Sequence, residues 1–136
     1  MNEFIVWDRE NKKFVENLTD YYLDKDCLLW KEECSKYECD LIIATDCICF
    51  PHIGKKDINN KKIYANCSIV EFKHITTYGC SYIRQGYFTF DNDLCCYIIK
   101  CINEDLILIY ACSVFSAITD IKIIDTIQEN KLGLIK

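Results

Sequence analysis

Short apolar runs separated by Asp- and Asn-rich segments fill the second half of the chain, and this alternation constrains its fold most strongly. The runs cover Ser81 to Arg84, Tyr87 to Phe90, Cys95 to Ile102, Leu106 to Cys112 and Ile121 to Ile127. Between them lie polar groups such as Asp91–Asp93 and Asn103–Asp105, which have the lengths of hairpin loops. Strands at such regular spacing predict a mainly β (α+β) protein, a small antiparallel barrel or sandwich.

The first half predicts further strands and one helix. Phe4 to Trp7, a polar segment and a new start at Phe14 indicate strand, turn and strand. Bulky or thiol side chains recur in steps of four and three at Leu23, Cys27, Trp30, Cys34 and Tyr37. This spacing predicts one short amphipathic helix over residues 23–37, with Asp24 as its N-cap.

The segment from Cys39 to Phe72 is predicted to be strand, loop and strand. Residues 39–50 are nearly all apolar, which predicts a buried strand that Pro51 ends because proline has no N–H for a β-ladder. Asp57, Asn59 and Asn60 suit a turn between Gly54 and Lys62, since their side chains bond nearby backbone. The apolar run IYANCSIVEF then predicts the next strand.

Length and composition predict one ordered globular domain. The 136 residues contain a single Pro and four Gly, and 51% of them are hydrophobic. No apolar run has the length of a membrane span, and acidic residues stand where a signal peptide would be basic, so we expect a soluble, cytoplasmic protein. The eleven cysteines, an odd number, are therefore predicted to be reduced thiols.

Three segments resemble one known family. The opening FIVWDRENKKFVEN matches a pattern in which a Trp-Asp pair precedes a charged turn; the matching residues are Trp7, Asp8, Asn11, Lys12 and Lys13. A central turn-and-strand signature is matched by Gly54, Lys56, Asp57, Asn60, Lys62, Ile63, Tyr64, Ile69 and Val70. The closing DIKIIDTIQEN matches at Ile121, Ile124, Ile127, Glu129 and Asn130.

On these residues the chain resembles the YopX family of bacteriophages, prophages and plasmids. The resemblance implies a single YopX-like domain over residues 1–136, with a variable part at 1–50 and a β-rich part at 51–136. Departures occur at Ile53–Lys55, Ala65–Ser68 and Asp125–Thr126, and Leu18 to Phe50 shows no match. The family has no established catalytic residues to transfer, so the resemblance implies a protein that is not an enzyme and uses no cofactor.

The cysteines and histidines offer two kinds of chemistry, each weighed against simple packing. Cys47, Cys49 and His52 form C-x-C-x2-H, whose side chains could ligate zinc, but no second pair of ligands follows at a usual spacing. A thiol paired with His52 or His74 could act as a nucleophile, but needs an orienting third group that the sequence does not reveal. The adjacent Cys95 and Cys96 would point to opposite faces of a strand. We therefore predict core packing for these cysteines, with no metal and no catalysis.

Two charged groups are candidates for binding. Acidic residues surround the predicted helix and could imitate a phosphate backbone toward a basic protein, although a solvated helix face would look the same. This set consists of Asp20, Asp24, Asp26, Glu32, Glu33, Glu38 and Asp40. The alternative is a lysine cluster at a turn, where basic side chains contact phosphates or merely keep a hairpin soluble. It contains Lys55, Lys56, Lys61 and Lys62.

The leading functional hypothesis is a phage or prophage accessory protein that binds a host protein, for example an inhibitor of antiviral defence such as an anti-CRISPR protein. It combines the resemblance to a mobile-element family with a net charge of −5 and no evident catalytic set. The alternative is a nucleic-acid-binding module of phage replication or gene control. Exposed aromatic residues and sheet edges would also let copies of the chain associate.

Overall fold

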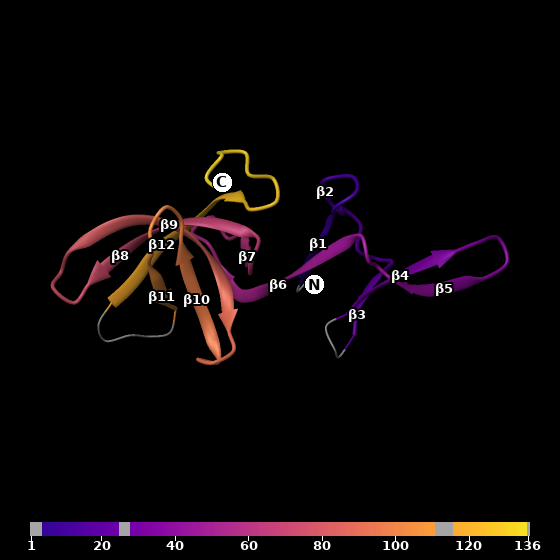
Figure 1. Ribbon diagram of the computed structural model, residues 1–136, viewed down its shortest axis with the longest axis horizontal. Helices are drawn as coiled ribbons and strands as arrows, with labels where there is room; N and C mark the ends of the chain where they lie inside the picture. The colour runs from indigo at the N-terminus through magenta and orange to yellow at the C-terminus, as the bar shows by residue number, and fades with distance from the viewer. Residues whose placement is uncertain (1–3, 25–27, 111–115, 136) are drawn as a thin grey trace. The chain divides into compact units, whose positions relative to one another are not determined.

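The computed structural model describes residues 4–24, 28–110 and 116–135, and it is built from β-strands (Figure 1). The chain divides into two compact units, Met1–Phe50 and Pro51–Lys136. The prediction of a mainly β protein is confirmed. The described ranges contain no helix, and therefore none long and apolar enough to cross a membrane.

The first unit opens with a small hairpin. Strands β1 (Phe4–Asp8) and β2 (Lys13–Phe14) pair antiparallel, and the rings of Trp7 and Phe14 meet edge to face with centroids 4.8 Å apart. The Asp8 carboxylate accepts the backbone N–H groups of Glu10 and Asn11, which closes the turn. The predicted strand, turn and strand are confirmed here.

A three-stranded antiparallel sheet replaces the predicted helix. Its order is β3 (Tyr21–Leu23), β4 (Leu29–Cys34) and β5 (Cys39–Ile43), and the described part of residues 23–37 is strand or loop. The helix prediction is wrong because it counted Cys34 and Tyr37 as core positions, whereas both are exposed. Pairing of β4 with a strand on each side satisfies its backbone instead.

Two strands replace the single buried strand predicted over residues 39–50. Strand β5 is exposed along its whole length, a turn follows at Ala44–Asp46, and β6 (Cys47–Lys56) then begins. Pro51 does not end β6, because the ladder there uses the carbonyl of Pro51, which accepts the N–H of Ala65 at 2.9 Å. In the order β2–β1–β6–β7, β6 is an inner strand.

The second unit contains a curled, five-stranded antiparallel sheet (Figure 1). Its order is β11 (Ile107–Ile109), β10 (Cys96–Cys101), β9 (Ser81–Asp91), β8 (Ser68–Thr76) and β12 (Ser116–Thr126), with β7 (Lys62–Tyr64) preceding it in the chain. The run IYANCSIVEF is two strands rather than one, because Asn66 takes a left-handed turn conformation. The two runs predicted at 81–84 and 87–90 join into β9.

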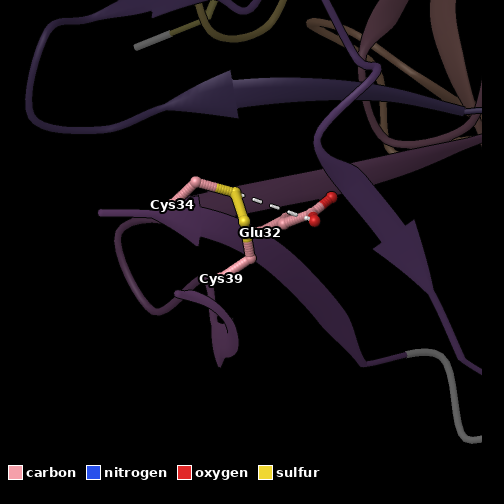
Figure 2. A group of neighbouring side chains, drawn as sticks. All are labelled: Glu32, Cys34 and Cys39. Atoms are coloured by element: carbon pink, nitrogen blue, oxygen red, sulfur yellow. Dashed lines mark hydrogen bonds between the residues drawn. A yellow bond between two sulfur atoms is a disulfide. The ribbon is translucent and has the colours of Figure 1, made fainter. Parts of the chain in front are cut away.

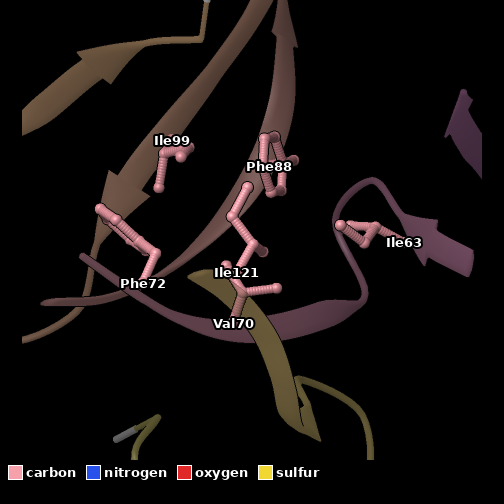
Figure 3. Close-up of a cluster of buried hydrophobic side chains, with 6 residues drawn as sticks. All are labelled: Ile63, Val70, Phe72, Phe88, Ile99 and Ile121. Atoms are coloured by element: carbon pink, nitrogen blue, oxygen red, sulfur yellow. The ribbon is translucent and has the colours of Figure 1, made fainter. Parts of the chain in front are cut away.

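The core of this unit lies against one face of the sheet (Figure 3). Alternate residues supply its side chains: Val70 and Phe72 from β8, Phe88 from β9, Ile99 from β10 and Ile121 from β12, together with Ile63 from β7. Gly86 lets β9 approach β10 closely, since a Cβ atom there would lie 2.6 Å from the carbonyl oxygen of Lys100. Burial of these apolar side chains is the main stabilising contribution in this unit.

Candidate functional site

The acidic residues predicted from the sequence fall mainly on and around the hairpin of β4 and β5. Asp20, Glu33, Glu38 and Asp40 are exposed, Asp24 and Glu32 are half-buried, and Asp26 lies outside the described residues. Asp24 is not a helix N-cap. Its carboxylate instead accepts the backbone N–H of Leu28 and the indole N–H of Trp30, at 2.9 and 2.8 Å, and so has a structural role.

Three of these carboxylates gather at the turn end of the hairpin. Glu33 and Asp40 are directly opposite each other in the register of β4 and β5, and Glu38 lies in the connecting loop. With Cys34, Ser35 and Ile42 they line a shallow cavity of about 240 Å³. Like charges placed opposite one another in a sheet are destabilising, which favours a cationic ligand or partner at this position.

The same hairpin exposes apolar side chains on an edge strand, a feature that the sequence had placed in the core. Leu41, Ile42 and Ile43 of β5 are 58%, 40% and 48% exposed. Strand β5 is an edge strand of the sheet β3–β4–β5, so no strand of this sheet pairs with one side of its backbone. The apolar run was visible in the sequence, but its exposure was not.

A disulfide closes the hairpin, which corrects the prediction that all cysteines are reduced (Figure 2). Cys34 and Cys39 face each other across β4 and β5 and are bonded. The sequence shows that they lie on either side of the turn Ser35–Glu38, but only the strand register shows that they meet. The Glu32 carboxylate lies beside them, with Oε1 3.8 Å from the Cys34 sulfur.

The structure does not bring Cys47, Cys49 and His52 together as a cluster of metal-ligating atoms. Burial raises the pKa of the Cys47 thiol, and the Tyr21 hydroxyl donates a hydrogen bond to the Cys47 sulfur. The Nε2 atom of His52 is 3.0 Å from the carbonyl of Lys55. Among the described residues, three ligand atoms within 4.8 Å of one another are found at Glu32, Cys34 and Cys39.

The second predicted histidine, His74, is buried and belongs to a polar cluster with Arg84 and Glu104. The Nε–H of Arg84 donates to His74 Nδ1 at 3.1 Å, and Arg84 also pairs with Glu104. Burial first, and then the adjacent guanidinium, lower the pKa of His74, so the ring is neutral near pH 7. One ring nitrogen is therefore occupied by Arg84 rather than by a thiol.

The other thiols of the second unit differ widely in environment. Burial raises the pKa of Cys67 to about 12, which leaves this thiol protonated and unreactive at neutral pH. Cys95 is exposed in a turn and Cys96 begins β10, so the adjacent pair is not wholly within a strand. Thiol catalysis therefore gains no support from Cys67, the most buried of these side chains.

The four lysines are brought to one hairpin of the second unit. Lys56 and Lys62 are register partners in β6 and β7, and Lys55 and Lys61 are exposed beside them. Asp57 is buried and accepts the N–H groups of Asn59, Lys61 and Ile123 at 2.8 to 3.0 Å. This carboxylate joins the hairpin to β12 and is not part of the exposed surface.

Comparison with known proteins adds no relative. No family model, no curated protein and no solved structure matches the chain. The likeness to the YopX family therefore stays a prediction from the residues quoted above.

Proposed function

We propose that this protein acts by binding a host protein through the sheet β3–β4–β5. The observation that carries the proposal is β5, an edge strand whose five residues are all exposed and of which three are large and apolar. Exposed apolar edge strands tend to pair with other chains, and natural proteins usually protect them with charge, proline or a covering element. We infer that a partner covers this one.

Addition of a partner strand to β5 is the mode of binding that fits this surface. An extended segment would pair with the open backbone of β5, while Leu41 and Ile43 contact it on one face of the sheet and Ile42 on the other. Tyr37, which is 88% exposed in the loop before β5, offers a further aromatic contact. The contact therefore combines backbone pairing with apolar anchors.

The carboxylates around β5 indicate the class of partner. Glu33, Glu38 and Asp40 are exposed, and a basic surface would relieve their mutual repulsion. Host proteins that bind nucleic acid have such surfaces, and these include antiviral effectors. Together with the resemblance to phage proteins, this favours inhibition of a nucleic-acid-binding defence protein over catalysis.

A capture experiment with matched variants tests the proposal. The wild-type chain, Leu41→Lys/Ile43→Lys and the control Ile107→Lys are immobilised and exposed to bacterial host lysate. Ile107 is a suitable control because it is 60% exposed on β11, an edge strand of the five-stranded sheet. We expect the same host protein with the wild type and the control, and at least about tenfold less with the β5 variant.

Two outcomes would count against this function. Recovery of no recurring protein would remove the basis for a host partner, and loss with Ile107→Lys alone would move the interface to the second unit. Dissociation of the captured protein should also become easier as salt rises, because the acidic contribution is screened.

The second candidate function is nucleic-acid binding by the lysines of the β6–β7 hairpin. It is favoured by the placement of Lys55, Lys56 and Lys61 together on an exposed turn, with the nearby Asp57 buried. A labelled DNA or RNA oligonucleotide should then bind at low salt. Charge reversal of these lysines should abolish the shift, whereas Glu33→Gln should leave it unchanged.

A further inference from the structure

Glu32, Cys34 and Cys39 place one carboxylate and two sulfur atoms within 4.8 Å of one another (Figure 2). Thiolates and carboxylates are ligands of zinc and of related divalent cations. We propose that, once the disulfide is reduced, these three side chains form a binding site for a thiophilic divalent cation of the zinc class. The inference does not depend on the proposed function.

Strand register places the three side chains on the same face. Glu32 and Cys34 are two residues apart in β4 and therefore point the same way, and Cys39 is the direct partner of Cys34 in β5. The Cα atoms of the two cysteines are 4.0 Å apart. A pair of neighbouring strands thus supplies all three ligands without a contribution from any other element.

The hairpin has its own support besides the disulfide. The N–H of Ser35 donates to the Glu38 carbonyl at 2.7 Å, and the N–H of Glu38 donates to the Ser35 hydroxyl at 3.3 Å. These bonds close the turn between the cysteines and do not involve sulfur. We therefore expect the two thiols to stay opposite each other after reduction.

Glu32 is oriented by a neighbour in the manner of a metal ligand. The Tyr22 hydroxyl donates to its Oε2 at 3.0 Å, while Oε1 lies 3.8 Å from the Cys34 sulfur. One oxygen is thus held from behind and the other is directed at the thiols. Hydrogen bonds of this kind to a ligating group commonly raise metal affinity, and their loss costs about 10- to 100-fold.

The geometry required by a tetrahedral cation is within reach of these side chains. With Zn–S bonds of about 2.3 Å, two thiolates on one zinc ion lie about 3.8 Å apart. Directly opposed residues of an antiparallel pair have Cβ atoms about 4.5 to 5.5 Å apart, so rotation of the side chains suffices. The fourth position would be taken by water, because both cysteines are exposed.

The chemistry of opening the site is a simple exchange. A dithiol reductant transfers two electrons and two protons to the Cys34–Cys39 bond, giving two thiols and the oxidised reductant. Binding of the cation then releases the two thiol protons, while Glu32 binds as the carboxylate. Oxidation and metal binding are therefore mutually exclusive at this hairpin.

The surrounding charge favours cation capture. Glu33 and Asp40 lie one residue from the cysteines on the same two strands, with their side chains on the opposite face, and Glu38 lies in the turn between the cysteines. Three exposed carboxylates raise the local concentration of divalent cations and, by attraction, favour the cation-bound form of the site. The same charges would repel anionic thiol reagents.

Titration of the full chain with Co²⁺ tests the proposal. Co²⁺ reports thiolate ligation through its absorption spectrum, and Zn²⁺ should displace it. The titration is made with a phosphine reductant and again after oxidation of the Cys34–Cys39 pair. We expect the Cys34→Ser/Cys39→Ser variant to bind one Co²⁺ fewer per chain than the reduced wild type, and the oxidised wild type to match that variant.

The double variant Cys47→Ser/Cys49→Ser is the matched control, since it removes the same number of thiols from the other candidate set. It should keep the Glu32 site. The variants Glu32→Gln and Tyr22→Phe leave both thiols in place and should weaken binding by roughly tenfold or more.

The proposal is overturned if Cys34→Ser/Cys39→Ser binds as much Co²⁺ as the wild type with the same thiolate spectrum. Binding that is lost only in Cys47→Ser/Cys49→Ser would assign the metal to that other set. Equal binding by the oxidised and reduced chains would also contradict it.

Discussion

Strands of similar composition have opposite environments in the two units. The segment CDLII of β5 and the segment SIVEF of β8 each have three bulky apolar residues among five. In β8, Ile69, Val70 and Phe72 are fully buried, whereas all of β5 is exposed. The difference is that β8 is an inner strand with a covered face, and β5 is the edge of a three-stranded sheet.

This contrast teaches that apolarity of a strand does not by itself decide its burial. The core cluster of the second unit collects side chains from five strands. In contrast, among the described residues of strands β3, β4 and β5, the buried hydrophobic side chain is that of Leu29 alone. The stability of the sheet β3–β4–β5 is therefore expected to depend on local bonds and on a partner. The stability of the five-stranded sheet is expected to depend on its own core.

The largest effect should come from the core of the second unit. Phe88→Ala should lower the free energy of unfolding by about 3 to 5 kcal/mol, because it leaves a cavity among fully buried side chains. Urea denaturation followed by circular dichroism measures the change. Phe90→Ala, on the same strand but about half exposed, is the control. Equal losses in the two variants would mean that the core does not stabilise this unit.

The buried carboxylate of Asp57 should have the next largest effect. Asp57→Ala should lose about 2 to 3 kcal/mol, because the N–H of Ile123 and those of the turn lose a charged acceptor. Asp91→Ala is the control, since the described hydrogen bonds of the Asp91 carboxylate go to backbone N–H groups of its own turn. A loss no greater than that of the control would show that the link to β12 is unimportant.

The pH dependence of stability sharpens the same test. Burial tends to raise the pKa of Asp57, but three backbone N–H groups hold it below its ordinary value of 3.8. A lowered pKa in the folded state gives stability that is present above pH 3.8 and is lost as pH falls through the folded value. Denaturation midpoints of Asp57→Asn between pH 2 and 6 should lack this contribution, whereas Asp91→Asn should retain it.

A smaller and local effect is expected from the disulfide. Reduction of Cys34–Cys39 should destabilise the β4–β5 hairpin by about 2 kcal/mol, because the closed loop is short. Amide hydrogen exchange measures this, and protection should fall in β4 and β5 while β8 and β9 remain unchanged. A Cys34→Ser/Cys39→Ser chain treated in parallel should not respond to the reductant. Loss of protection in β8 and β9 as well would mean that the five-stranded sheet is not stabilised independently of the sheet β3–β4–β5.

The smallest effect should come from the exposed face of β5. Leu41→Ser should change the free energy of unfolding by no more than about 0.5 kcal/mol, because the side chain is already in water. Ile99→Ser, which introduces a hydroxyl into the core, serves as the contrasting variant. Thermal unfolding of the two chains side by side makes the comparison. A loss of several kcal/mol for Leu41→Ser would mean that a second copy covers β5.

Much of the fold followed from patterns of neighbouring residues. Most strand positions of the second unit and the turns within Gly54–Lys62 and at Asp91–Asp93 were predicted because their backbone preferences are local. The helix over 23–37 was wrong because the spacing of three and four counted Cys34 and Tyr37 as core positions, and both are exposed. The exposure of β5 could not be predicted, since an apolar run is the same in a buried and in an edge strand.

The candidate sites show the same division. The sequence indicated which residue types carry charge or sulfur, and the four lysines do share a hairpin because they lie close together in the chain. It did not indicate that Cys34 bonds to Cys39 or that Tyr22 orients Glu32, because those contacts depend on strand register.

By itself the sequence determined that this protein is built of β-strands joined by Asn- and Asp-rich turns, because those preferences reside in single residues and their neighbours. Tertiary structure alone decided which apolar strand is buried, which carboxylate is structural and which sulfur atoms meet. The physical reason is that burial and side-chain contact depend on which strand lies alongside, and pairing between distant segments sets this.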